Sequence, residues 1–163
     1  MLFRSVQGYA LIFGKDGKPL GRDGNGPPTF GGTMGSEAIG FWHVEVGRAP
    51  SGPSEVALDN KAFAAGRFAI GDSVRITAAR GTRTFTLVGS ARFGTAGSPG
   101  GATFAMFDAP TAAEFVNGDA NRFDAIVVRG DGSVSESELV GRISSAIGTD
   151  GIETITGSQI EDE

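Results

Sequence analysis

Residues 70–89 read IGDSVRITAARGTRTFTLVG, and this stretch decides the fold. Apolar and polar residues alternate at 74–77 and again at 84–87, on either side of a turn at Arg80-Gly81. A period of two is typical of a strand that buries one face and exposes the other. The sequence therefore predicts a half-buried hairpin and, with it, a sheet that covers a core.

More strands are expected before this hairpin. Val6–Phe13 is an apolar and aromatic run that ends in a turn sequence of Gly, Lys, Asp and Pro, and Glu55–Leu58 is a short apolar strand. Asp59 is suited to cap a short helix that stops at Gly66. Between these elements, residues 21–40 are rich in Gly, Pro and polar residues, which predicts a long loop.

The C-terminal third predicts a β-α-β unit. A second Gly-rich loop covers Gly94–Gly101, and the elements expected after it are a strand at 102–107, a helix from Asp108 to Gly118, a strand at 123–129, a helix from Ser135 to Gly148 and a closing strand at 152–156. There is too little helix in the middle of the chain to cover both faces of a parallel sheet. We therefore expect the α+β class and not a doubly wound fold.

Composition limits the function classes. With 163 residues the chain has room for one domain or for two small subdomains that share a core. The net charge of -5 and the pI near 4.9 argue against nucleic acid as a partner, because phosphate binding needs a basic surface. The absence of cysteine excludes disulfides and thiolate metal sites.

Catalytic and cofactor motifs do not emerge from the sequence. Gly8 and Gly14-Lys15 have the wrong spacing for a phosphate-binding loop, and no carboxylate cluster matches a calcium loop. His43 is the only histidine, so a two-histidine metal site is excluded, and a structural role suits it better than a catalytic one. We expect no cofactor, no metal and no enzymatic activity.

Aromatic residues supply the candidate site. Phe41, Trp42 and Phe93, together with Phe104, could form a recognition surface for a partner, because aromatic side chains give large contact areas at a small entropic cost. Packing in the core is the alternative use of the same residues.

Several segments, taken in order, carry a resemblance to a known family. They are VQGYA at 6–10 with GKDGK at 14–18, GRAP at 47–50 with GPSEVALD at 52–59, IGDSVRI at 70–76, FTLVG at 85–89 with ARFG at 91–94, and GATFAMFD at 101–108. Their order and spacing resemble the extracytoplasmic core domain of ABC transporter permeases of the MacB/FtsX-like type.

The resemblance implies a fold and a role. It implies a ferredoxin-like β-α-β porter-type subdomain built from residues 1–40 and 102–163, and a small β-rich subdomain inserted at 41–101. The full protein would lie in the cell membrane with this domain on the extracytoplasmic side, pair with a second permease copy and couple to a cytoplasmic ATP-binding subunit. The domain would transmit ATP-driven motion to an external substrate or protein. Relatives begin with a further β-α piece, which we expect, like the flanking membrane helices, outside this sequence.

Two other interpretations stay open. The first is a free-standing secreted or cytosolic domain that binds a small ligand or a protein through the loops at Gly21–Gly40 and Gly94–Gly101, since loops of this length are often functional. The second is a small hydrolase that uses His43. Fold analogy alone supplies the transporter hypothesis, and fold does not fix function.

Overall fold

The alternating stretch forms the expected hairpin. Strand β7 (Ser73–Ala78) pairs antiparallel with β8 (Gly81–Phe93), and the pairing runs from Ser73 opposite Thr86 to Ala78 opposite Gly81. The apolar residues of the alternation are buried, and they are Val74, Ile76, Phe85 and Leu87. Gly81 has a φ of +91°, a conformation that glycine adopts without strain, so it suits the tight turn.

The structure is a computed structural model that describes residues 2–21, 28–35, 41–95, 99–148, 151–157 and 159. Strands dominate this part of the chain. Besides β7 and β8 they are β1 (Leu2–Ser5), β2 (Gln7–Tyr9), β3 (Leu11–Phe13), β4 (Thr29–Thr33), β5 (Trp42–Gly47), β6 (Glu55–Asp59), β9 (Thr103–Phe107) and β10 (Ala125–Val128). The helices are α1 (Asn60–Ala65), a 3-10 turn η1 (Pro99–Gly101), α2 (Ala109–Thr111), a π-helical turn η2 (Ala112–Val116) and α3 (Glu136–Ile147).

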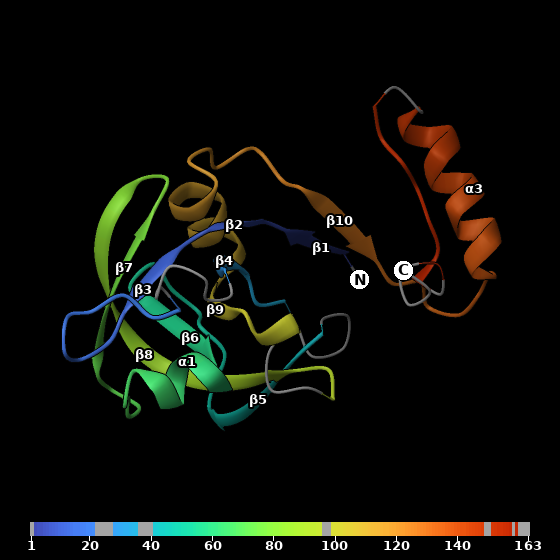
Figure 1. Ribbon diagram of the computed structural model, residues 1–163. Coiled ribbons are helices and arrows are strands. Elements are labelled where there is room, and N and C mark those ends of the chain that lie inside the picture. Colours follow the sequence, from blue (N-terminus) through green and yellow to red (C-terminus); the bar gives the residue numbers. More distant parts are fainter. Residues whose placement is uncertain are drawn as a thin grey trace. The chain divides into compact units, whose positions relative to one another are not determined.

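The main sheet curls round and meets itself. Its strand order is β2-β4-β9-β6-β8-β7-β3, with β5 beside β8, while β1 and β10 form a separate two-stranded sheet. The two outermost strands in that order, β2 and β3, are separated in sequence only by Ala10 (Figure 1). Gln7–Phe13 therefore pairs with β4 in its first half and with β7 in its second, so a single stretch of chain joins both edges.

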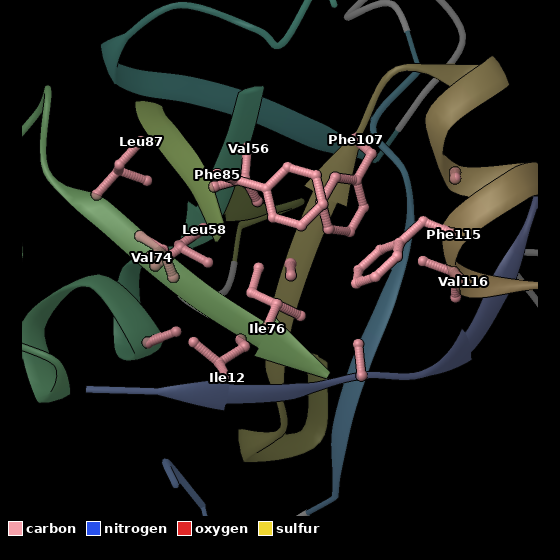
Figure 2. Packing of buried hydrophobic residues seen from close by; sticks show 14 of the residues in the cluster. Ile12, Val56, Leu58, Val74, Ile76, Phe85, Leu87, Phe107, Phe115 and Val116 are labelled. Carbon is pink, nitrogen blue, oxygen red and sulfur yellow. The ribbon is translucent and has the colours of Figure 1, made fainter. Parts of the chain in front are cut away.

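The enclosed face of this sheet holds the main core. Phe85, Phe107 and Phe115 form a ring triad with centroid distances of 4.9, 5.0 and 5.6 Å. Figure 2 shows these rings meeting between the strands and η2, with aliphatic side chains filling the rest of the space. The aliphatic side chains come from β3, β6, β7 and β8 and include Ile12, Val56, Leu58, Val74, Ile76 and Leu87.

Glycines let η2 approach the sheet. A Cβ at Gly8 would lie 2.9 Å from Val116 Cγ1, and a Cβ at Gly31 would lie 3.2 Å from Val116 Cγ2 and 2.7 Å from the Cβ of Ala10. Neither position has space for a larger side chain unless its neighbours shift. The bare backbone of β2 and β4 therefore sets how closely η2 packs on the sheet.

Asp59 links α1 to the centre of the sheet. Its carboxylate accepts hydrogen bonds from the N–H groups of Lys61 (3.1 Å) and Ala62 (3.4 Å), which caps the helix, and from Phe104 N–H at 2.7 Å on β9. The side chain is fully buried, and burial raises the pKa of Asp59 to about 6, against the opposing effect of the three N–H donors. A single side chain thus satisfies donors from two elements.

Most of the elements expected from the sequence are confirmed. The Val6–Phe13 run forms β2 and β3, Asp59 caps a helix that ends at Gly66, and Asp108 caps the helical segment before Gly118. Ser135 accepts from Glu138 N–H at the start of α3, as half of the expected capping box.

Two expectations are wrong. The predicted loop at Gly21–Gly40 contains β4, which lies inside the sheet between β2 and β9. β4 has two glycines in five residues, so its sequence lacks the apolar alternation by which strands are recognised. The predicted closing strand at 152–156 has no strand structure. Ile152 is 54% exposed and Ile155 38%, so this segment buries too little apolar surface to be held against a sheet.

The fold is mixed α and β, with a curled sheet as its main feature. The chain divides into two compact units, one formed by Phe3–Val127 and the other by the first two residues with Val128–Glu163. These bounds differ from the proposed insertion of 41–101 into 1–40 and 102–163, and that division, like its ferredoxin-like part, stays a prediction. Within the part of the chain that the structure describes, no helix is long and apolar enough to span a membrane.

Replacing Asp59 tests its double role. Asp59→Ala removes a helix cap and leaves the buried Phe104 N–H without an acceptor, so the free energy of unfolding should fall by about 2–4 kcal/mol. Asp108→Ala is the matched control, because Asp108 caps a helix through Thr111 N–H alone, and its loss should cost only about 1 kcal/mol. Urea unfolding measures both values, and equal losses would contradict the role of the Phe104 bond.

Candidate functional site

The outward face of the sheet carries a second apolar cluster. Because side chains alternate along a strand, Ala105 and Phe107 of β9 belong to the enclosed core, whereas Phe104 and Met106 belong to the cluster outside it. The buried members of this outer cluster are Met34, Trp42, Ala57, Ala91, Phe104 and Met106. Phe30, Val44 and Phe93 pack against them and are only partly buried.

Five rings in this region form a continuous series. Trp42 lies at the middle, with its ring centroid 5.1 Å from those of Phe93 and Phe104. The series continues outward from Phe93 to Phe41 at 5.6 Å and from Phe104 to Phe30 at 6.1 Å. The pairs are tilted or edge-to-face, the arrangements that the charge distribution of aromatic rings favours.

These rings line a pocket of about 310 Å³ in the unit formed by Phe3–Val127. The five rings of the series and Phe3 make up half of its twelve described lining residues. The aliphatic part of the wall consists of Val6, Met34 and Val127, and the polar part consists of Ser5, Gln7 and Thr33. None of the described lining residues carries a charge, so this part of the wall presents aromatic and neutral polar surface.

Backbone pairing positions the rings of β5 and β8. Trp42 lies opposite Phe93 in the antiparallel register, and Gly94 N–H donates to the carbonyl of Phe41 at 2.7 Å. Further along the same pair, Gly47 has a φ of +76°, and a Cβ there would lie 2.1 Å from the carbonyl oxygen of Val88. Only glycine fits this contact, which holds the far end of β5 against β8.

Polar contacts tie β5 to the helix beside it. Asn60 Nδ2 donates to Glu45 Oε2 at 2.5 Å and Ser90 Oγ donates to Asn60 Oδ1 at 2.6 Å. Arg92 Nε lies 3.3 Å from Glu45 Oε1. These contacts join β5, β8 and α1, so the strand that carries Trp42 is fixed on its polar side as well.

Two arginine–glutamate pairs in this unit have the bidentate geometry of structural ion pairs. Arg48 holds Glu55 through two hydrogen bonds of 2.7 and 2.5 Å, and with the N–H of Ser51 it lowers the pKa of Glu55 to about 2. Arg83 makes a similar bidentate pair with Glu114 on η2 and lowers the pKa of that carboxyl. Neither carboxylate is poised near neutral pH for proton transfer.

The structure brings the predicted aromatic residues together. Trp42 and Phe104 are buried, Phe93 is partly buried, and Phe41 is 51% exposed. Trp42 and Phe104 are thus used in packing, whereas Phe41 has an accessible face, and a recognition surface for a partner stays a prediction.

Sequence reasoning missed the other eight described lining residues of the pocket. Phe3, Phe30, Met34 and Val127 come from segments whose pairing the sequence did not predict. β4 carries Phe30 and pairs in parallel with β9, which places Phe30 opposite Phe104. The one available signal was Phe30 itself, an isolated apolar residue within a Gly-rich stretch.

The other candidates from the sequence are His43, a metal site and the two Gly-rich loops. His43 lies on β5 opposite Arg92, partly buried. Among the described residues, no group of three or more His, Asp or Glu side chains is placed to hold a metal ion. The loops proposed for ligand binding lie partly outside the described residues, at 22–27, 36–40 and 96–98.

Comparison with known proteins gives no family for this chain. No protein-family model matches the sequence, and no curated protein matches it significantly.

The stability of two alanine variants distinguishes a ring that packs in the cluster from a ring that is accessible to solvent. Phe104→Ala should lower the free energy of unfolding by about 3–5 kcal/mol, because the ring is 6% exposed and packs against Trp42. Phe41→Ala should cost under about 1 kcal/mol, since half of that side chain is already in solvent. Urea unfolding followed by the emission of Trp42, the single tryptophan, measures both. A large loss for Phe41→Ala would make Phe41 a core residue instead.

Proposed function

We propose that this chain is the extracytoplasmic domain of an ABC transporter permease of the MacB/FtsX-like type. In this proposal the domain catalyses no reaction and transmits ATP-driven conformational change to an external substrate or protein. The ordered resemblance of eight segments between Val6 and Asp108 suggests the family. The observation that carries the proposal is the arrangement of the two chain ends.

Both ends of the chain contribute to the same compact unit. The first two residues group with Val128–Glu163. A domain that is joined to a membrane through both ends needs them on one side. This grouping supports the proposal, because a chain with its ends in different units would fit a membrane-tethered domain poorly.

The unequal cohesion of the two units also supports a mechanical role. Phe3–Val127 contains both apolar clusters, whereas the described residues from 128 onward include no buried side chain. Transmission of motion requires parts that move as separate bodies. The division into a unit with a closed sheet and a unit with little core of its own supports this part of the proposal.

The partners follow from the same proposal. They are a second permease copy, a cytoplasmic ATP-binding subunit and an external substrate or protein, with the domain on the extracytoplasmic side of the cell membrane. The net charge of -5 argues against nucleic acid.

A free-standing secreted binding domain is the second candidate, and the aromatic pocket favours it. An apolar pocket with a few neutral polar groups is typical of small-ligand sites. In this case the full protein would have neither membrane helices nor an ATP-hydrolysing partner.

Single-cysteine labelling tests the location, in a full-length protein whose cysteines outside this cysteine-free chain are all replaced by serine. Ser73→Cys lies on an exposed position of β7, and in the full-length protein in intact cells it should react with a membrane-impermeant maleimide as fully as after lysis. Ser90→Cys is the matched control, since Ser90 is 2% exposed and should react only after denaturation. Labelling of Ser73→Cys that appears only after lysis would refute an extracytoplasmic domain.

Co-purification separates the two candidates. The full-length protein extracted from membranes should carry an ATP-hydrolysing subunit with it. An extracytoplasmic location without membrane association or an ATPase partner would reject the permease proposal and leave the secreted binding domain.

A further inference from the structure

The aromatic pocket is built into strands of the main sheet. Phe30, Trp42, Phe93 and Phe104 come from β4, β5, β8 and β9, so their positions are set by the backbone ladders of one sheet. Sites on strands are held more firmly than sites on loops. The part of the wall that these four rings form is therefore as preformed as the main sheet is.

Glycine backbone underlies two of the rings. A Cβ at Gly32 would lie 3.3 Å from the ring of Phe104 and 2.3 Å from the carbonyl oxygen of Val6. A Cβ at Gly35, where φ is +73°, would lie 2.9 Å from the ring of Phe3. The rings of Phe104 and Phe3 therefore pack directly against the backbone of these two glycines, and a larger residue at either glycine would disturb the pocket wall.

The lining defines the chemistry of an occupant. A charged group would lose its hydration there without gaining an opposite charge, which disfavours it strongly. Ser5, Gln7 and Thr33 offer only neutral hydrogen-bonding groups, and Thr33 Oγ1 already accepts the N–H of Val6 at 3.1 Å. An occupant must therefore be uncharged and largely apolar.

The size of the pocket limits the occupant further. Ligand pockets are commonly about 300–1,000 Å³, and this one is at the lower end of that range. Ring faces along the wall favour flat, unsaturated groups, because offset and edge-to-face contacts add to the burial of apolar area. Phe41, at 51% exposure, provides an accessible ring at the end of the series.

We infer that this pocket is a binding site for a small, uncharged, ring-containing apolar molecule, held between the rings from Phe41 to Phe104. The inference does not depend on the permease proposal, because it rests on the lining alone. It holds equally for a transported substrate, a regulatory ligand or the ligand of a secreted domain.

N-phenyl-1-naphthylamine, a neutral fluorescent probe, tests the inference on the intact chain. Its binding should quench the emission of Trp42 by energy transfer, and Trp42 is the only tryptophan that can do this. An anilinonaphthalene that carries a sulfonate should bind at least tenfold more weakly. Failure to quench Trp42, or equal affinity for the sulfonated probe, would overturn the inference.

Matched variants locate the probe. Phe41→Ala should weaken binding at least fivefold, whereas Tyr9→Ala should leave it unchanged, because Tyr9 is also an exposed aromatic residue (54%) but does not line the pocket. Val127→Glu should weaken binding at least tenfold by placing a carboxylate in the wall. Circular dichroism checks that each variant is folded, and Phe41→Ala alone decides the result if Val127→Glu is not. Equal weakening by Tyr9→Ala and Phe41→Ala would contradict binding in this pocket.

Discussion

The closure of the sheet through Gln7–Phe13 is the constraint on which the rest of the structure depends. One stretch of chain pairs with β4 before Ala10 and with β7 after it, so both edges of the strand order are occupied by neighbouring residues. An unpaired sheet edge can associate with another chain. The pairing of β2 with β4 and of β3 with β7 leaves β4 and β7 without such an edge on the paired side. The close contact between Ala10 and Gly31 shows how little space this closure leaves.

Closure divides the side chains of every strand between an enclosed face and an outer face. The enclosed face holds the Phe85, Phe107 and Phe115 triad and the aliphatic core. The outer face of β9 and its neighbours then carries Trp42, Phe104 and Met106, which form a second cluster open to the pocket. The candidate site is thus the other side of the strands that build the core, and its rigidity derives from theirs.

Local patterns predicted the local structure well. The alternation at 73–87 identifies the hairpin, and Asp59 and Gly66 mark the ends of α1. The aromatic residues Phe41, Trp42 and Phe93 line one pocket, and their use as a partner surface stays a prediction. The sequence did not reveal β4, because a strand stabilised by pairing on both sides needs no apolar alternation of its own. Without β4, neither the parallel pairing that brings Phe30 to Phe104 nor the pocket could be predicted. The expected strand at 152–156 failed for the opposite reason, since a β-like composition does not supply a partner.

Native-state hydrogen exchange tests the central claim, that Gln7–Phe13 closes the sheet into one cooperative body. The paired amides of β2 and β3 should exchange with the same opening free energy as those of β6 and β8, because the sheet can open only as a whole. Amides of α3, where no described side chain is buried, should exchange at a much lower opening free energy. Exchange of β2 or β3 well before β6 and β8 would show that the sheet is open at Ala10 and would contradict the account.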